Sequence, residues 1–503
     1  MSSNLRKHPH LYEANARVFL NRVSTQHGRR LTLADVPVEE WQRLSRMGFD
    51  LIWLMGVWQR SPGARRQALL DPNLRRRYDH ALPGWSDDDV AGSPYAVYDY
   101  TIDPSLGKQG DLVGLRSALE RHGLGLVLDF VPNHVALDHP WVSLHPHRFI
   151  PSKKGDAASH PEWFFSSDDR ILLAHGRDPN FLPWTDTAQL NLFSAELRQA
   201  LVDELLRIAG MADGVRCDMA MLCLNSVFEK TWGAVLGDGP RPAAEFWPDA
   251  IEIVKRKHPG FLFVAEAYWG LEPVLQEMGF DFTYDKTFYD RLRFSAPADI
   301  SGYLGNAGVS HERMVRFIEN HDEPRARAVL GRERSVAAAT IILTVPGLRL
   351  LHDGQIEGRR THLPLQLVKE PDEAVDQETL RSYERLLEIC DSSLFHEGEW
   401  MPLKVTEAWE SNSSHGNLLA WSWCSPTHLA AVVVNYSPGR CQGRIRLPLD
   451  LEGIGSVTLQ DEVGGVTYLR DAAELRAQGL YVDLDPWQAH ILNARIGHPL
   501  MPG

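Results

Sequence analysis

Gly214-Val-Arg-Cys-Asp-Met-Ala-Met221 is the stretch from which the fold of this chain can be worked out. It predicts a short strand that follows a helix. On a strand, Arg216 and Asp218 point to the same face, because they are two residues apart. The guanidinium is expected to keep the carboxylate ionised and to fix its rotamer, as a covalent nucleophile requires. A structural ion pair on a barrel strand would give the same pattern, so the other stretches must decide.

Apolar strands and helices alternate in the first part of the chain. Residues 16–23 predict the first strand and residues 38–47 a helix. Residues 50–58 are nearly all apolar, as in a strand buried on both faces of a parallel sheet. Residues 60–110 are rich in Arg, Asp, Pro and Gly and predict a long loop, of the kind that often carries function. Tyr95 in this loop has two interpretations, a platform for a sugar ring or a packing residue of the loop.

The same alternation continues along the chain. Residues 111–122 predict a helix, and residues 123–130 an apolar strand that leads into polar groups. Eight strands that alternate with helices predict an α/β fold, the (β/α)8 TIM barrel. The remaining elements are strands at 214–221, 261–269, 280–285, 314–322 and 345–354, and helices at 195–209, 247–258 and 376–391.

Two segments interrupt or follow the barrel pattern. Residues 135–187 are rich in His, Pro, Trp and Asp and predict a subdomain inserted after the third strand. Residues 396–503 contain short alternating runs separated by turn residues, which predict a C-terminal antiparallel β-sandwich. The catalytic barrel is therefore expected to comprise residues 1–134 and 188–395.

Three carboxylates follow predicted barrel strands, at the end where the chemistry of such barrels gathers. They are Asp218, Glu266 and Asp322. Retaining glycosidases use one carboxylate as nucleophile and a second as acid and then base. The sequence Phe-Val-Ala-Glu-Ala-Tyr-Trp around Glu266 solvates a charge poorly, which is expected to raise the pKa of this acid. Asp322, beside His321, could hold ring hydroxyls more tightly as the ring flattens.

Four motifs, in this order, resemble those of glycoside hydrolase family 13, the α-amylase family. They are Asp129-Phe-Val-Pro-Asn-His134, Gly214-Val-Arg-Cys-Asp218, Val264-Ala-Glu266 and Phe317-Ile-Glu-Asn-His-Asp322. The resemblance also extends to the inserted subdomain and the C-terminal sandwich.

The resemblance implies a role for each motif residue. Asp218 would be the nucleophile, Glu266 the general acid and base, and Asp322 the group that stabilises the transition state. Histidines would contact hydroxyls of the sugar being cleaved, and Tyr95 would stack on its ring. The implied substrate-binding residues are Tyr95, Asp129, His134, Arg216 and His321.

The sequence departs from the family pattern at two kinds of position. Met221 and Leu222 stand where many members carry a Lys-His pair on the leaving-group side, and Ser93-Pro94 replace the usual His-Gly before the platform tyrosine. Gln189 stands where an Asp often binds calcium, and an amide is a poorer ligand for this ion. We therefore expect no required cofactor. Calcium near Asn133 stays possible but doubtful.

Metal ligands are otherwise weakly indicated. His145 and His147 are close in sequence, but no third ligand stands at a useful spacing, so solvated loop histidines are the favoured interpretation.

Composition excludes several other classes of partner. The net charge of −14 argues against nucleic acid and against anionic membranes. The five cysteines are an odd number without zinc-like spacing, which favours a reduced, cytoplasmic setting. We expect neither a signal peptide nor a membrane span, because no sufficiently long apolar run occurs. The oligomeric state stays open.

Three hypotheses for the function follow. The first is a retaining α-glycosidase that acts on α-1,4-linked glucans or malto-oligosaccharides. The second is a transglycosylase or glycoside phosphorylase on the same scaffold, in which the acceptor differs. The third is a non-catalytic carbohydrate-binding protein, which would be expected to lack at least one of the three carboxylates. The sequence leaves chain-length preference and endo or exo action open.

Overall fold

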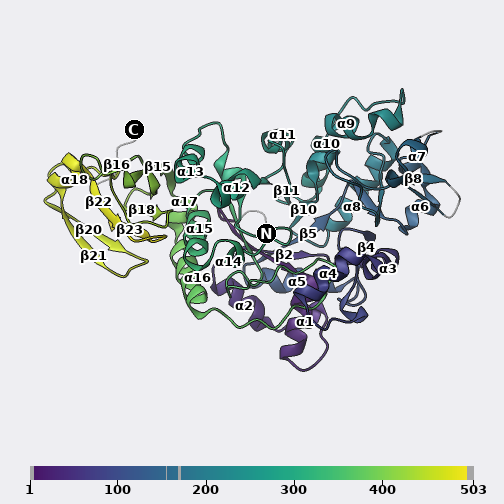
Figure 1. Ribbon diagram of the computed structural model, residues 1–503, viewed down its shortest axis with the longest axis horizontal. Coiled ribbons are helices and arrows are strands. Elements are labelled where there is room, and N and C mark those ends of the chain that lie inside the picture. The colour runs from purple at the N-terminus through teal and green to yellow at the C-terminus, as the bar shows by residue number, and fades with distance from the viewer. Residues whose placement is uncertain (1–4, 154–155, 168–170, 496–503) are drawn as a thin grey trace.

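The computed structural model describes residues 5–153, 156–167 and 171–495. Eight parallel strands close into a barrel in the order β1-β14-β13-β12-β11-β10-β5-β2, at the centre of Figure 1. This confirms the predicted TIM-barrel fold. The barrel strands are β1 (His10–Asn15), β2 (Leu51–Met55), β5 (Gly125–Phe130), β10 (Gly214–Cys217), β11 (Leu262–Ala265), β12 (Phe282–Tyr284), β13 (Met314–Arg316) and β14 (Leu348–His352).

The first strand lies earlier than the sequence pattern predicts. Residues 16–23, expected to be a strand, belong to helix α1 (Ala16–Gln26), and β1 precedes it. The Asn15 side chain accepts hydrogen bonds from the backbone N–H groups of Arg17 and Val18, which begins the helix at this point. The prediction was wrong because the apolar residues of α1 also fit a short buried strand.

Helices cover the outside of the barrel. Helix α8 (Ala195–Ala209) has the predicted bounds and buries the expected stripe of Leu197, Leu201, Leu205 and Ile208. The other helices are α2 (Val38–Arg46), α5 (Asp111–Glu120), α9 (Asn225–Leu236), α10 (Phe246–Lys257), α11 (Glu272–Glu277), α12 (Lys286–Phe294), α13 (Pro297–Leu304), α14 (Ala326–Val329), α15 (Arg332–Thr344), α16 (Gln377–Cys390) and α17 (Ser393–Glu397). Among the described residues, no helix is both long and apolar enough to cross a membrane.

The segment expected to be a long loop contains regular structure. It holds helices α3 (Pro62–Leu70) and α4 (Pro72–Ala81). Strands β3 (Trp58–Arg60) and β4 (Val97–Ile102) pair as a small antiparallel sheet. Ser61 and Asp71 cap the two helices, and a proline occupies the first helical position in each. Loop-like composition here marks helix starts.

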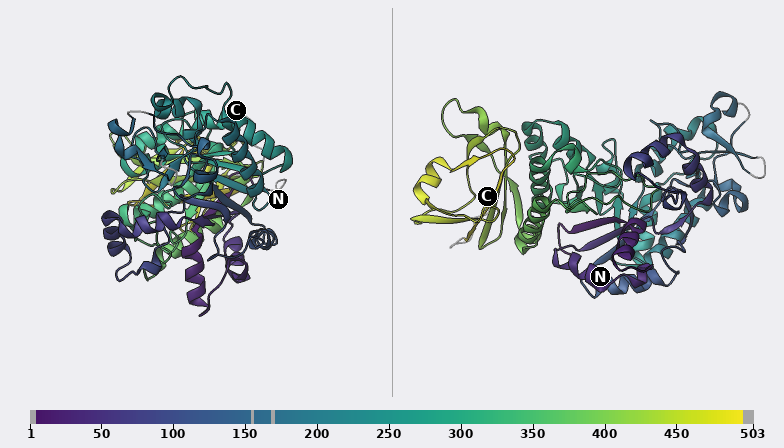
Figure 2. Two further views of the ribbon diagram at one scale, coloured as in Figure 1. Left: turned by 90° about the vertical axis from the view of Figure 1, so that its right-hand side faces the viewer. Right: turned by 60° about the horizontal axis from the view of Figure 1, so that its bottom comes forward.

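Between β5 and α8, the chain forms small antiparallel sheets of its own. Strand β6 (His134–Ala136) pairs with β9 (Thr187–Gln189), and β7 (Phe164–Ser166) pairs with β8 (Leu172–Ala174). Short helices α6 (Pro140–Leu144) and α7 (Asp156–Ser159) lie among them. This segment projects at one end of the molecule in Figure 1 and Figure 2.

The C-terminal strands form two antiparallel sheets at the opposite end of the molecule, coloured from green to yellow in Figure 2. They attach to the barrel through buried contacts, such as the hydrogen bond that Trp423 Nε1 donates to Thr344 O at 2.6 Å. One sheet has the order β15-β17-β18-β23-β20-β21 and the other β16-β19-β22. The strands are β15 (Glu399–Pro402), β16 (Val405–Glu407), β17 (Leu418–Cys424), β18 (His428–Asn435), β19 (Cys441–Ile445), β20 (Ser456–Asp461), β21 (Thr467–Asp471), β22 (Leu480–Leu484) and β23 (Ala489–Arg495), with helix α18 (Ala472–Gln478) after β21.

Candidate active site

Asp218 and Glu266 follow neighbouring parallel strands of the barrel. Strands β10 and β11 pair with Arg216 opposite Val264. The Glu266 backbone N–H then donates to Cys217 O at 3.0 Å, which extends the pairing past the end of the strands. The two carboxylates therefore leave the barrel at the same end and at nearly the same level.

The guanidinium of Arg216 holds both carboxylates. Its Nη1 donates to Asp218 Oδ1 at 2.7 Å, and its Nη2 lies 2.8 Å from Glu266 Oε2. Arg216 is only 1% exposed, and it lies 5.3 Å from the ring centroids of both Trp53 and Tyr95. This rigid fork therefore holds the two carboxylates on one cation.

Glu266 occupies the environment expected of a general acid. It is buried, and burial raises its pKa to about 7, with Arg216 opposing this effect and Asp218 adding to it. Tyr268 Oη donates to Glu266 Oε1 at 2.7 Å, and the Met219 backbone N–H donates to Oε2 at 2.7 Å. The side chain is therefore fixed in place and can hold a proton close to neutral pH.

The pKa of Asp218 differs from the sequence expectation. Burial raises it above its ordinary value, and the attraction of Arg216 opposes this rise without cancelling it. Asp322 and Asp129 raise it further. Arg216 donates a well-aligned hydrogen bond to Asp218, whereas its contact with Glu266 is an ion pair only. This difference favours the charge on Asp218 and the proton on Glu266.

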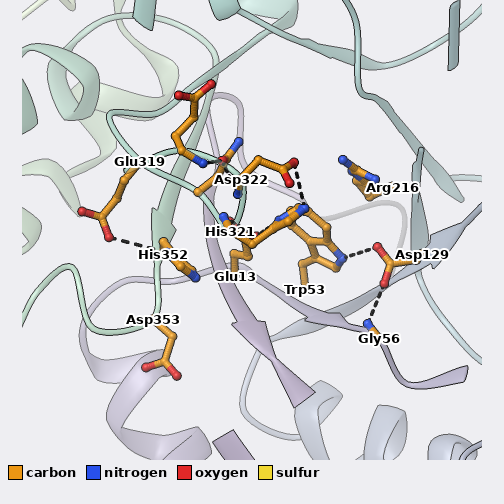
Figure 3. A network of polar contacts seen from close by, with 12 residues as sticks. Glu13, Trp53, Gly56, Asp129, Arg216, Glu319, His321, Asp322, His352 and Asp353 are labelled. Atoms are coloured by element: carbon orange, nitrogen blue, oxygen red, sulfur yellow. Dashed lines mark hydrogen bonds and ion pairs between the residues drawn. The ribbon is translucent and has the colours of Figure 1, made fainter. Parts of the chain in front are cut away.

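His321 links Asp322 to a carboxylate at the bottom of the site, as Figure 3 shows. Its Nδ1 donates to Glu13 Oε1 at 2.5 Å, and its Nε2 lies 3.0 Å from Asp322 Oδ2. Burial alone would lower the pKa of His321, but Asp322 and Glu13 raise it to about 10. His321 is therefore a cation near neutral pH. It lowers the pKa of Asp322 to about 2, although burial acts in the opposite direction. The Asp322 side chain is 42% exposed, so it can reach a ligand.

Sequence reasoning missed Glu13. This residue is completely buried on β1 and faces His321 from 308 positions away in the chain. A carboxylate within the otherwise apolar and aromatic run Leu11-Tyr-Glu-Ala14 was the available signal. It went unnoticed because the first strand was expected at residues 16–23.

Asp129 lies beside Arg216, but its carboxylate is held by the barrel wall (Figure 3). Trp53 Nε1 donates to Oδ1 at 3.1 Å, and the Gly56 backbone N–H donates to Oδ2 at 2.7 Å. The residue is 2% exposed, and burial raises its pKa. Protein groups thus occupy both carboxylate oxygens. This geometry favours a structural role for Asp129 in the barrel wall over direct contact with a sugar.

Tyr95 and His134 complete the surface next to the carboxylates. The Tyr95 ring stacks on His321 with centroids 5.5 Å apart, and its Oη lies 2.9 Å from His321 Nε2. His134 is buried and packs against Trp184, with ring centroids 4.9 Å apart. Burial lowers the pKa of His134 to about 3, so its ring is neutral. The expected sugar-contacting groups therefore gather in one place, one histidine charged and the other neutral.

Comparison with known proteins identifies the family. The protein-family model of the α-amylase catalytic domain matches residues 38–385. The chain belongs to the α-amylase family. It is 27% identical over 334 residues to the α-amylase MalA of Haloarcula japonica. This alignment covers 65% of this chain and 41% of MalA. It is 25% identical over 508 residues to α-1,4-glucan:maltose-1-phosphate maltosyltransferase 2 of Streptomyces coelicolor, covering 94% of this chain and 65% of the other.

Among solved structures, the maltogenic α-amylase AmyB of Thermotoga neapolitana aligns with a TM-score of 0.67 at 18% identity, over 97% of this chain and 99% of the other. This likeness supports the fold. The chain spans less than two thirds of the length of the two curated relatives described above.

The turn after β10, where the family pattern would place a Lys-His pair, is apolar. Met221 and Leu222 are both buried in the turn after β10 and offer no charged group. Trp269, just beyond Glu266, has a φ of +64° and a side chain that is 44% exposed. The exposed indole ring, close to Glu266 in the chain, offers a flat apolar face to solvent.

The residues near Asn133 do not fit the calcium ion that the family resemblance allows. Gln189 is completely buried, and its Nε2 donates to Asn133 O at 2.9 Å, Asn133 Oδ1 at 3.0 Å and Leu190 O at 3.1 Å. The Arg177 backbone N–H, which can only donate, points at Gln189 Oε1 at 3.3 Å and so fixes the orientation of the amide. A donor nitrogen therefore takes up the oxygens that would otherwise converge on a hard cation.

A third ligand for the histidine pair comes from a distant part of the chain. His145, His147 and Glu196 have ligand atoms within 4.8 Å of one another. The sequence could not show this, because Glu196 belongs to helix α8. The carboxylate already accepts hydrogen bonds from His147 at 2.6 Å and from Arg148 at 3.0 and 3.1 Å. An arginine on the carboxylate disfavours a cation at this place.

Proposed function

We propose that this protein is a retaining α-glycosidase that acts on α-1,4-linked glucans or malto-oligosaccharides. The observation that carries the proposal is the single guanidinium of Arg216, which contacts Asp218 and Glu266 at the ends of adjacent strands. The two carboxylates differ in environment as the two roles require, one hydrogen-bonded to a cation and the other with its pKa raised to about 7.

In the first half-reaction, an Asp218 oxygen attacks the anomeric carbon as the glycosidic C–O bond breaks. Glu266 gives its proton to the departing oxygen, and a glycosyl ester forms on Asp218. In the second half-reaction, ionised Glu266 takes a proton from water, whose oxygen attacks the anomeric carbon and releases Asp218. Arg216 contacts both carboxylates throughout, so it can balance the negative charge as it moves between them.

Asp322, His321 and Tyr95 are proposed to hold the sugar that is cleaved. Asp322 is ionised and partly exposed, which suits a carboxylate that accepts hydrogen bonds from ring hydroxyls. The positive charge of His321 sits beneath it, and the Tyr95 ring stacks on His321. A cationic histidine that is fixed by Glu13 holds this group in place before substrate binds.

The second candidate is transfer to a sugar or phosphate acceptor in place of water. Two observations favour it: the buried, apolar Met221 and Leu222 on the leaving-group side, and the relatives named as maltosyltransferases. The first half-reaction would be the same, and only the group that resolves the glycosyl ester would differ.

Product analysis tests the function and separates the two candidates. The protein is incubated with a malto-oligosaccharide ladder, trehalose, sucrose and glucose 1-phosphate, each with and without phosphate. Hydrolysis gives shorter oligosaccharides with new reducing ends, whereas transfer gives longer ones or sugar phosphates. Asp218→Asn and Glu266→Gln are expected to lower kcat roughly 10⁴-fold while the far-UV spectrum stays unchanged. Wild-type turnover in Asp218→Asn would refute the assignment.

We also propose that the protein works in a reducing compartment, the cytoplasm. All five cysteines are free, and four of them are buried. The amide of Gln189 in place of a cation supports activity without added calcium.

A further inference from the structure

The residue that follows the proposed nucleophile has an uncommon backbone conformation. Met219 lies in the left-handed region, with a φ of 42° and a ψ of 48°. Residues other than glycine rarely adopt this region, because their Cβ atom then lies close to the following carbonyl oxygen. Five described residues other than glycine have a positive φ, and Met219 is the only one of them that adjoins Asp218, Glu266 or Asp322 in the sequence.

The turn at Met219 brings two successive N–H groups to the general acid. The Met219 N–H donates to Glu266 Oε2 at 2.7 Å, and the Ala220 N–H donates to the backbone oxygen of Glu266 at 3.1 Å. Successive N–H groups converge on one partner only where the chain between them turns, and φ and ψ of Met219 define that turn. The left-handed conformation therefore holds the side chain and the main chain of Glu266 together.

Hydrogen bonds on both sides keep Met219 in this conformation. Before it, the Asp218 N–H donates to Phe130 O at 2.8 Å. After it, Trp247 Nε1 donates to Ala220 O at 2.9 Å. The surrounding structure thus imposes a backbone conformation that methionine itself disfavours, and residues held in this way cluster at functional sites.

We propose that Met219 is a positioning residue, whose left-handed backbone directs its N–H group at the carboxylate of Glu266. This role rests on the proposed function, in which Glu266 gives its proton to the departing oxygen. Glu266 Oε2 also lies 2.8 Å from Arg216 Nη2, so two donors converge on this oxygen. The acidic proton therefore belongs on Oε1, the oxygen that Tyr268 contacts.

A substitution that turns the Met219 N–H away should make Glu266 a weaker acid. The hydrogen bond favours the ionised carboxylate, so its loss raises the pKa of Glu266. Met219→Val should have this effect, because β-branched residues tolerate the left-handed region least. We expect the midpoint of the Glu266 titration to rise by about one pH unit. We also expect kcat to fall about tenfold, with KM within about twofold of the wild type. The ionisable groups that face Glu266, all unaltered in this variant, are Arg216, Asp218, Tyr268, Tyr284 and Asp322.

Met219→Gly separates the backbone from the side chain. Glycine adopts the left-handed region freely, so this variant should keep the wild-type midpoint although it has no side chain. A role of the methionine side chain predicts the opposite order, with glycine more damaging than valine. Met219→Ala also removes the side chain but fits this backbone less well, so it should melt below Met219→Gly. Ser411→Val is the matched control, because Ser411 is exposed on the C-terminal domain and has a φ of 70°.

Two measurements report the midpoint. One is the basic limb of kcat/KM for a malto-oligosaccharide. The other is the infrared band of the protonated Glu266 carboxyl, assigned by its loss in Glu266→Gln, which needs no turnover. Absence of turnover in the wild type would refute the proposed function, and the infrared titration would still test Met219.

The role of Met219 is disproved if Met219→Val titrates as the wild type does, or if Met219→Gly or Ser411→Val shifts the midpoint as far as Met219→Val. If Met219→Val does not fold, the two smaller variants decide. Met219→Ala melting at or above Met219→Gly would then disprove the role, and melting below it would support the role.

Discussion

The hydroxyl of Tyr268 is expected to set the pH range in which Glu266 can act as an acid. Its Oη donates to Glu266 Oε1 at 2.7 Å, and this hydrogen bond lowers the pKa of Glu266 against the larger, opposite effect of burial. Tyr268→Phe removes the donor and keeps the ring. The substitution should therefore raise the pKa of Glu266 above its value of about 7.

The size of the shift follows from the energy of one hydrogen bond. A bond to a charged group contributes about 1.5 kcal/mol or somewhat more, and 1.36 kcal/mol corresponds to one pKa unit. Because the bond favours the ionised form, its loss should move the pKa up by about one unit. A general acid must be protonated, so kcat/KM falls as pH rises through its pKa in the free enzyme. The basic limb should move from about pH 7 to about pH 8.

The assay is the pH profile of kcat/KM for a malto-oligosaccharide between pH 5 and 10. Tyr481→Phe serves as the matched control, because Tyr481 Oη also donates to a carboxylate, Asp483 at 3.3 Å, but on the C-terminal sheet. The control should leave the basic limb where it is in the wild type. A Tyr268→Phe limb that stays near pH 7, or moves to lower pH, would show that Glu266 is not the group that titrates or that Tyr268 does not act on it.

Three further predictions concern stability. Removal of divalent ions with EDTA should leave the melting temperature unchanged. Gln189→Ala should lower the free energy of unfolding by about 2–4 kcal/mol, because buried oxygens lose their donor. A clear fall in melting temperature with EDTA would contradict the conclusion that the Gln189 amide stands in place of a cation. The pKa of His321 is raised to about 10, so protonated His321 contributes stability that is complete below about pH 6.5 and is lost as the pH rises toward 10. Glu13→Gln should reduce this loss of stability in thermal melts. An unchanged pH dependence in the variant would argue against the Glu13–His321 ion pair. Arg316→Leu should destabilise the fold by about 3–5 kcal/mol, measured by urea unfolding, because it leaves Asp285 buried without its cation. Adding Asp285→Asn should recover part of that loss. Equal stability of the single variant and the wild type would contradict this prediction.

The order and chemistry of the strand ends could be predicted from the sequence. Asp218, Glu266 and Asp322 each follow an apolar run, and parallel barrel strands all deliver their carboxyl ends to one face. Their convergence therefore needed no knowledge of side-chain packing. Helix α8 was predicted with its observed bounds for a similar reason, since its apolar stripe repeats over 15 residues.

The predictions from sequence were wrong where the same local composition fits two kinds of structure. The run 16–23 is apolar enough for a strand, but the Asn15 cap makes it a helix. The Ser-Pro and Asp-Pro pairs at 61–62 and 71–72, read as loop, begin helices α3 and α4. In both cases the deciding factor was a hydrogen bond that a capping side chain accepts from a backbone N–H group, which composition alone does not reveal.

The sequence by itself determined the barrel and the carboxylates at its carboxyl end, because both depend on periodicity and strand direction along the chain. The charge on His321, the shared guanidinium between Asp218 and Glu266 and the position of the Gln189 amide were decided only by the tertiary structure. Each depends on groups that are distant in the chain and on the exclusion of water between them. Electrostatic energies change severalfold with such burial, and no single stretch of sequence encodes it.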